Sequence, residues 1–365
     1  MNMMTVLNTQ LKPELNPEVQ FVDQFGRAKR KLRISVTDRC NFKCIYCMPE
    51  HPEWMKKHDL LSFEELHAFC DFMVRRGIES IRITGGEPLM RQGVVHFVAQ
   101  LQDLKKLGLK RISMTTNAHY LKKYAQALKQ AGLDDLNVSL DSLEADQFQQ
   151  LTKKHLTPVL DGIRVAQAVG LPVKINCVLI NGINDDQILP LARWSVQEKI
   201  SVRFIEFMPL DGDRKWSAGH VVSEQKILAT LATKFAVTKH ETTNQATDLL
   251  HSHSSSDPAR QYFIDGHPIG IISTMTNSFC GTCDRIRLTA QGEFYNCLFA
   301  PKGLSLKSEI KALVSVEHLS EVSLYHALST YIWKKEQGFD AIQQRLNNQS
   351  MDKKSRKISM HMLGG

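Results

Sequence analysis

The segment that decides the fold is residues 31–47, which read KLRISVTDRCNFKCIYC. Its first seven residues alternate polar and apolar side chains, which is the pattern of a β-strand whose two faces meet different surroundings. The strand leads into Cys40, Cys44 and Cys47, which are separated by three and then two residues. A strand that ends in closely spaced cysteines places candidate metal ligands at one end of its sheet.

The same unit, a short β-branched run followed by a turn and an amphipathic helical stretch, recurs along the chain. Glycines follow several of the helical stretches, as is typical of helix C-termini. Six strand–helix units in a row predict a parallel sheet, and right-handed crossovers between them predict an α/β fold of the incomplete (β/α)6 barrel type. The predicted strands are 31–37, 80–84, 111–117, 135–141, 173–180 and 201–208, and the predicted helices include 62–76, 94–107, 120–131 and 158–169.

Three regions are expected along the chain. Residues 1–30 form a partly irregular N-terminal extension, 31–240 the barrel, and 241–365 a C-terminal α+β region. The last region opens with a loop rich in Thr, His and Ser at 242–256, followed by strands at 269–273 and 285–289 and helices at 323–333 and 339–346. His251 and His253 could bind a metal, but a solvated loop is the expectation for this stretch.

The predicted strands lack the continuous hydrophobic runs of a parallel sheet that is buried on both faces. One face is polar and includes Arg33, Arg82 and Lys174, whereas the opposite face is aliphatic. In a barrel this alternation predicts a polar cavity able to hold a large ligand; strands with one face in solvent are the alternative. Buried cations need carboxylates or an anionic ligand, and a triphosphate would serve.

The composition is that of a globular protein, with 42% hydrophobic and 23% charged residues among 365. The net charge of +8 weakly favours a polyanionic ligand. The sequence contains no signal peptide pattern and no apolar run long enough to span a membrane, so a cytoplasmic protein with reduced thiols is expected.

Six of the eight cysteines fall into two triplets. The first is Cys40, Cys44 and Cys47, and the second is Cys280, Cys283 and Cys297. Structural zinc and protein-bound iron–sulfur cubes normally take four protein ligands. Two triplets therefore favour two clusters, each with one open iron, and a zinc site that pairs the triplets or recruits histidines is the alternative. Cys70 and Cys177 lie on apolar faces and are expected in the core.

The cysteine spacing, with Tyr46 before the last cysteine, and the sequence GGEP at 85–88 resemble the radical SAM (S-adenosylmethionine) superfamily. Within it, the chain is similar to the molybdenum cofactor protein A (MoaA) group from about Leu32 to its last residue. Ala118 after TTN and Asp284 after the second cysteine pair depart from the group's usual residues. The segments that carry the likeness are LRISVTDRCNFKCIYCMP, IRITGGEPLMR, TTN, LNVSLDSL, VKINCVLI, RFIEFMPLDGD, FCGTCDRIRLT, CLF and the terminal GG.

The resemblance implies a radical SAM lyase that cyclises GTP in the first step of molybdenum cofactor biosynthesis. It implies a TIM-type partial barrel and two [4Fe–4S] clusters, the first bound by Cys40, Cys44 and Cys47 together with SAM, and the second carried by the C-terminal region on Cys280, Cys283 and Cys297. The implied SAM contacts are Tyr46, Gly86, Ser139 and Met208. The implied GTP contacts are Arg33, Arg82, Thr115, Lys174, Arg285, Ile286 and Arg287, and the implied catalytic residues are Arg285, Arg287, Gly364 and Gly365.

The resemblance also implies a reductant such as flavodoxin or ferredoxin, and transfer of the product to cyclic pyranopterin monophosphate synthase. A monomer or homodimer without nucleic-acid or membrane partners is expected. Two other classes of protein remain open from the sequence. One is a peptide-modifying radical SAM enzyme, although such enzymes generally carry more C-terminal cysteines, and the other is a zinc-stabilised nucleic-acid binder, although the basic residues lack interleaved aromatic ones.

Overall fold

A single twelve-stranded sheet forms the frame of the computed structural model, which describes residues 20–211, 213, 215–239, 257–315, 319–348 and 359–364. Eight strands run parallel in its centre, in the order β10-β1-β2-β3-β4-β5-β6-β9. Antiparallel β11 and β12 extend one edge, and β8 and β7 extend the other. The strands are β1 Lys31–Ser35, β2 Ser80–Thr84, β3 Arg111–Thr116, β4 Asp135–Ser139, β5 Val173–Leu179, β6 Ser201–Glu206, β7 Val237–Lys239, β8 Arg260–Ile264, β9 His267–Ile272, β10 Arg285–Leu288, β11 Glu293–Tyr295 and β12 Leu304–Ser305.

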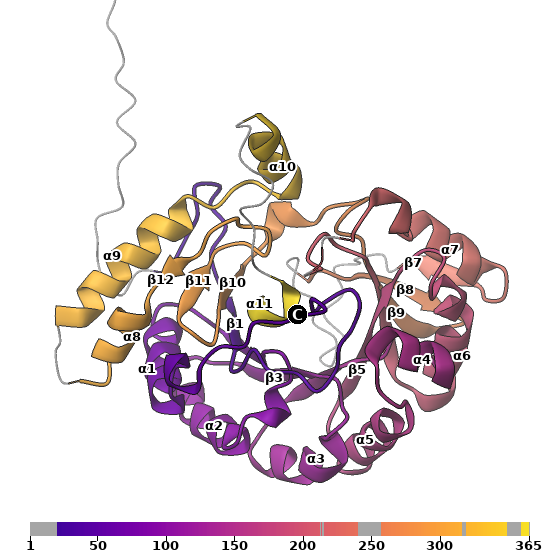
Figure 1. Cartoon of the computed structure of the whole chain (residues 1–365), viewed down its shortest axis with the longest axis horizontal. Coiled ribbons are helices and arrows are strands. Elements are labelled where there is room, and N and C mark those ends of the chain that lie inside the picture. The colour runs from indigo at the N-terminus through magenta and orange to yellow at the C-terminus, as the bar shows by residue number, and fades with distance from the viewer. Residues whose placement is uncertain are drawn as a thin grey trace, which may run out of the picture.

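The helices lie outside the curved sheet, and the C-terminal segment lies inside it (Figure 1). The α-helices are α1 Phe63–Val74, α2 Val94–Leu101, α3 Leu121–Gln130, α4 Ala145–Thr152, α5 Thr157–Ala168, α6 Ile188–Glu198, α7 Glu224–Ala232, α8 Lys307–Ala312, α9 Leu319–Trp333, α10 Phe339–Asn348 and α11 Met360–Leu363. Short 3-10 helices occur at Lys57–Asp59, Pro88–Met90, Gln102–Leu107, Asp185–Gln187, Ala218–His220 and Cys280–Thr282.

The parallel sheet predicted from the strand–helix repeat is confirmed, and the predicted strand β2 has the same bounds in the structure. Helix α1 begins with a capping box, in which the Ser62 side chain accepts from the backbone N–H of Glu65 and the Glu65 side chain accepts from the backbone N–H of Ser62. The predicted helix 94–107 is instead an α-helix to Leu101 that continues as the 3-10 helix Gln102–Leu107.

The aliphatic strand face packs under the helices, and the polar face looks into the curve of the sheet. Leu32, Ile81 and Ile112 are fully buried in one large hydrophobic core. Period-two alternation therefore separates the residues that hold the fold together from the residues available for binding.

The region after residue 240 builds on both edges of the same sheet. Strand β9 pairs in parallel with β6, and β10 pairs in parallel with β1, so the second cysteine triplet is brought beside the first strand. The loop predicted at 242–256, with His251 and His253, lies entirely outside the described residues.

The last residues of the N-terminal extension are packed, although their sequence has no periodicity. Val22 and Ala28 form an isolated antiparallel bridge. Phe21 and Lys29 on either side of it are among the largest fully buried side chains. Residues 21–29 are thus a fixed part of the fold.

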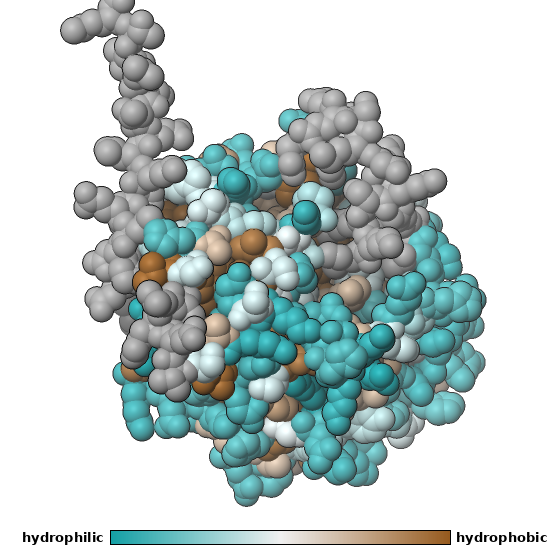
Figure 2. Space-filling model, turned by 60° about the vertical axis from the view of Figure 1, so that its left-hand side comes forward, coloured by the Kyte–Doolittle hydropathy of each residue, from teal (hydrophilic) through white to brown (hydrophobic). Residues whose placement is uncertain are grey.

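The face drawn in Figure 2 is covered mainly by hydrophilic residues, with hydrophobic ones in small patches. Among the described residues, no helix is both long and apolar enough to cross a membrane.

Candidate functional site

Both cysteine triplets line one cavity of about 320 Å³ on the polar side of the sheet. This volume lies within the usual range of small-molecule sites. Residues from β1 to β6 and from β10 contribute to its wall, together with the loop of the first triplet and the C-terminal helix α11. The fold therefore gives one chamber with potential metal ligands from two distant parts of the chain.

The loop of the first triplet is held against the GGEP turn by backbone hydrogen bonds. The N–H of Gly86 donates to the carbonyl of Thr37 at 2.7 Å, and that of Glu87 donates to the carbonyl of Arg39 at 2.8 Å. A Cβ atom at Gly86 would lie 2.4 Å from the Arg39 carbonyl oxygen. This close approach of two backbones explains the glycine.

We expect Gly86→Ala to disrupt this site, because the added methyl group meets backbone atoms that cannot move without displacing the cysteine loop. The variant should retain less than half of the iron of the wild-type protein after anaerobic reconstitution. Gly108→Ala is the matched control, because a Cβ atom added at this surface glycine would have nothing within 4 Å. Because Gly108 has a φ of +113°, a loss of stability without loss of iron is expected there. Full iron loading of Gly86→Ala would contradict the account.

Glu87 joins the GGEP turn to the end of β3. Its carboxylate accepts from the N–H groups of Leu89 at 3.1 Å and Asn117 at 2.7 Å, and from the hydroxyl of Thr116 at 2.8 Å. The Asn117 amide in turn lies 3.7 Å from the sulfur of Cys40. Burial raises the pKa of Glu87 to about 7, although these three donors oppose the shift.

The raised pKa of Glu87 predicts a pH dependence of stability. The folded chain holds a proton on Glu87 up to about pH 7, whereas the unfolded chain releases it near its ordinary pKa of 4.5. This contribution to stability is complete below pH 4.5 and is lost as the pH rises through 7, by about 3 kcal/mol in total.

In denaturant unfolding between pH 5 and 8, the free energy of unfolding of Glu87→Gln should therefore increase relative to that of the wild type as the pH rises. Glu53→Gln, at an exposed position, is the matched control. If the free energies of unfolding of Glu87→Gln and the wild type change in parallel with pH, the raised pKa of Glu87 is contradicted.

A second buried carboxylate orients the aromatic residue of the first triplet. Asp141 accepts from the Tyr46 hydroxyl at 2.6 Å and from the Val178 N–H at 2.9 Å. Burial raises the pKa of Asp141 to about 6. Tyr46, which lies between Cys44 and Cys47 in the sequence, is thus held in place at the cavity wall.

Cationic side chains surround the second triplet. Burial raises the pKa of the Cys283 thiol, but the charges of Arg285 and Lys335 outweigh this effect and hold the pKa at about 5. The N–H of Phe299 donates to the sulfur of Cys297 at 3.5 Å. Cys283 is therefore set up as a thiolate, the form that binds metals.

The donor set of each triplet fits an iron–sulfur cube closed by three protein thiolates. All six cysteines are free thiols on the wall of the cavity, and Cys70 and Cys177 are fully buried elsewhere. Within the described ranges, no three His, Cys, Asp or Glu side chains are arranged around the position of a single metal ion. A zinc ion needs all its ligands at about 2.0–2.3 Å from one point, whereas a cube is larger and its thiolates stand further apart.

Three arginines occupy neighbouring positions on the cavity side of the sheet. Arg33 of β1 is in register with Arg287 of β10 and with Arg82 of β2. Removal from bulk water lowers the pKa of Arg33 well below its ordinary value, and the charges of Arg287 and Arg82 lower it further. A row of like charges at the spacing of adjacent strands is a site for a polyanion.

Comparison with known proteins shows the family. The radical SAM superfamily profile matches residues 34–195, and the Molybdenum Cofactor Synthesis C profile matches residues 200–341. The GTP 3′,8-cyclase of Streptomyces coelicolor is 40% identical over 82% of this chain and 87% of its own length. That of Staphylococcus haemolyticus is 36% identical over 95% of this chain and 99% of its own length. The chain belongs to the GTP 3′,8-cyclase family of radical SAM proteins.

Solved structures agree on the radical SAM fold. Streptococcus suis SuiB bound to S-adenosylmethionine covers 92% of this chain and 77% of its own length, with a TM-score of 0.58 and 15% identity. The structure of anSMEcpe with bound AdoMet covers 83% of this chain and 82% of its own, with a TM-score of 0.54 and 15% identity. The membership of this chain in the cyclase family therefore rests on sequence similarity alone. Its fold is supported both by sequence similarity and by similarity to solved structures.

The structure brings nearly all the predicted site residues of this cyclase-family chain to the cavity. Ile286 and Gly364 do not line it, and the side chain of Ile286 is fully buried in the core, so only its backbone is left for substrate. Gly364 lies beside the cavity, where its carbonyl accepts from Arg287 at 2.7 Å, and Gly365 is outside the described residues. The cavity-lining residues predicted for SAM are Tyr46, Gly86, Ser139 and Met208, and those predicted for GTP are Arg33, Arg82, Thr115, Lys174, Arg285 and Arg287.

Sequence reasoning missed further residues of the cavity wall, among them Arg111, Arg203, Lys335 and His361. Arg111 and Arg203 lie on the polar strand faces, where the alternation that identified Arg33 would also have found them. Arg203 donates to the side-chain oxygen of Asn137 at 2.5 Å. Lys335 and His361 belong to a turn and to a short helix without alternation, so no local signal indicates them.

Proposed function

We propose that this protein is a GTP 3′,8-cyclase, a lyase that converts GTP into (8S)-3′,8-cyclo-7,8-dihydroguanosine 5′-triphosphate in molybdenum cofactor biosynthesis. The observation that carries the proposal is the cavity lined by both cysteine triplets and by the row of Arg33, Arg82 and Arg287. A chamber lined by two sets of potential cluster ligands and by several cations suits a nucleoside triphosphate. Identity of 36–40% to family members over most of their length supports the same activity.

The first triplet would hold a [4Fe–4S] cluster with SAM, within an incomplete TIM-type barrel, and the second triplet would hold another cluster in the C-terminal region. With SAM bound, the cluster held by Cys40, Cys44 and Cys47 would supply the reductive cleavage of SAM, the chemistry by which a hydrogen atom is taken from C3′ of the ribose. The net conversion joins C3′ to C8 of guanine and needs one further electron and a proton. Flavodoxin or ferredoxin would supply electrons, and cyclic pyranopterin monophosphate synthase would take the product.

The residues around this cavity would have three roles: binding the triphosphate, positioning SAM and excluding water. Arg33, Arg82 and Lys174 bind the triphosphate by charge-assisted hydrogen bonds. Tyr46, fixed by Asp141, forms a rigid wall beside SAM. Enclosure by the sheet and by α11 excludes water, which protects a reactive carbon radical. Fixing both reactants in this way contributes about 7–11 kcal/mol in well-oriented reactions.

The C-terminal segment would complete the chamber. Arg287 donates to the carbonyl of Gly364, and the N–H of Met360 donates to the carbonyl of Leu210 at 3.1 Å. A Cβ atom at Gly364 would lie 2.2 Å from the methyl group of Thr84, so only glycine fits here without rearrangement. The tail thus places its own backbone beside Arg287 at the reaction chamber.

The test is anaerobic reconstitution with iron and sulfide, followed by SAM, dithionite and each nucleoside triphosphate in turn. GTP alone should stimulate release of 5′-deoxyadenosine and yield the cyclised product by mass spectrometry. Equal stimulation by ATP, or iron-free protein that binds zinc only, would overturn the proposal.

A further inference from the structure

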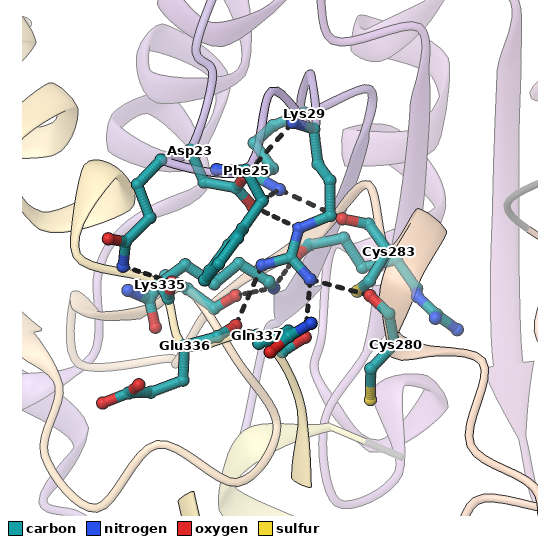
Figure 3. Close-up of polar contacts among 12 residues, drawn as sticks. Asp23, Phe25, Lys29, Cys280, Cys283, Lys335, Glu336 and Gln337 are labelled. Carbon is teal, nitrogen blue, oxygen red and sulfur yellow. Dashed lines mark hydrogen bonds and ion pairs between the residues drawn. The ribbon is translucent and has the colours of Figure 1, made fainter. Parts of the chain in front are cut away.

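A buried cluster of charged side chains lies directly behind the second cysteine triplet. It comes from residues 23–29, which precede the first strand, and from Lys335 in the turn after α9. Figure 3 shows Asp23, Lys29 and Lys335 gathered around the backbone of Cys280 and Cys283. The proposed reaction does not use any of these N-terminal residues.

The N-terminal side chains contact the backbone of the cluster ligands themselves. Arg27 donates to the carbonyl of Cys280 at 2.7 Å and to that of Gln337 at 2.8 Å. Lys29 donates to the carbonyl of Cys283 at 3.0 Å and to the carboxylate of Asp23 at 2.6 Å. Asp23 also accepts from the Arg27 guanidinium at 2.7 Å, so one carboxylate fixes both cations.

Lys335 holds the remaining part of the second triplet. Its ammonium donates to the carbonyl of Arg285 at 3.2 Å and to the carbonyl of Asn296, which precedes Cys297. The carbonyl of Lys335 accepts from the amide of Gln24 at 3.1 Å. Each cysteine of the triplet is therefore tied, directly or through its neighbour, to a buried cation.

The charges in this cluster do not balance. The exposed fractions of Arg27, Lys29 and Lys335 are 8%, 0% and 2%, and Asp23 is fully buried. Asp284 nearby is paired with Lys31 at 3.3 Å. Arg27 and Lys29 thus share the carboxylate of Asp23, and Lys335 adds a third buried cation that donates to backbone carbonyls. Uncompensated buried charge is costly. An iron–sulfur cube held by three thiolates is anionic, and it becomes more so on reduction, so it supplies the missing negative charge.

We infer that Lys29, held by Asp23, is a positioning residue for the second cluster and sets its reduction potential. This inference rests on the proposed function, because it requires a cluster on Cys280, Cys283 and Cys297. A positive charge close to the cluster favours the reduced form. Loss of that charge should make the potential more negative, and loss of the Asp23 charge should make it more positive.

The experiment uses the full chain with Cys40, Cys44 and Cys47 replaced by alanine, so that only the second cluster is present. The parent should bind about four iron atoms per chain. Redox titration followed by electron paramagnetic resonance then compares the parent with Lys29→Met, Asp23→Asn and the matched control Arg30→Met. Arg30 is the adjacent cation, but it is exposed, so solvent screens its charge.

The expected result is a negative shift for Lys29→Met, a positive shift for Asp23→Asn and no shift for Arg30→Met. If Lys29→Met binds no iron but keeps the circular dichroism of the parent, the positioning role is supported, and Asp23→Asn tests the charge. Shifts of the same sign in Lys29→Met and Asp23→Asn, or none in either, would overturn the inference. A parent that binds no iron would instead overturn the proposed second cluster.

Discussion

Replacing Cys44 or Cys283 by alanine should abolish formation of the cyclised product, with a loss of at least about a thousandfold, because each proposed cube would have only three protein ligands. Iron should fall from about eight to about four atoms per chain in both variants. The two triplets should differ in one respect. Cys44→Ala should also lose 5′-deoxyadenosine formation, whereas Cys283→Ala should retain part of it without product.

Cys70→Ala is the control for this pair of variants. Cys70 is fully buried in α1, away from the cavity, so its replacement removes a thiol without removing a cluster ligand. Iron content and product formation should stay near those of the wild type. Wild-type iron in Cys283→Ala would show that the second triplet holds no cluster.

Replacing Arg33 by methionine should raise the KM for GTP by about 10- to 150-fold, the loss expected from one hydrogen bond to a charged group at about 1.5–3 kcal/mol. Iron content should be unchanged. The nucleotide-free variant should also melt at a higher temperature than the wild type, because Arg33 is repelled by Arg287 and Arg82 when no anion lies between them.

The control for Arg33→Met is Arg75→Met, which removes an exposed arginine whose ion pair with Asp71 lies on the surface. Its KM should be that of the wild type. A normal KM for GTP in Arg33→Met, whatever its melting temperature, would contradict a triphosphate site at the arginine row.

Because the family resemblance implies that Arg285 and Arg287 contact GTP, loss of either would be expected to weaken GTP use and spare cluster assembly. For Arg287, which donates to the carbonyl of Gly364, we still expect weaker GTP use with normal cluster assembly. The expectation is different for Arg285, because its guanidinium hydrogen-bonds to the sulfur of Cys283. Arg285→Ala should therefore affect the second cluster as well as the substrate.

Local patterns in the sequence predicted the centre of the fold well. Alternation over residues 80–84 sets both the bounds of β2 and the side on which Arg82 lies, because each side chain of a strand is committed to one face. The same reasoning separated the core residue Ile81 from the cavity residue Arg82.

The surroundings of the second cysteine triplet could not be predicted in this way. Lys29 and Lys335 are 306 positions apart, and each reaches the site by hydrogen bonds to backbone carbonyls, which leave no trace in side-chain periodicity. Contacts of this kind depend on how β10 pairs with β1, a long-range feature of the whole sheet.

The most direct test of the account is turnover with GTP deuterated at C3′, using anaerobically reconstituted protein. Deuterium is expected to move into 5′-deoxyadenosine, because the proposed chamber would fix the ribose beside the first cysteine triplet. Deoxyadenosine that forms at the same rate without GTP, and that carries no deuterium when GTP is present, would contradict it.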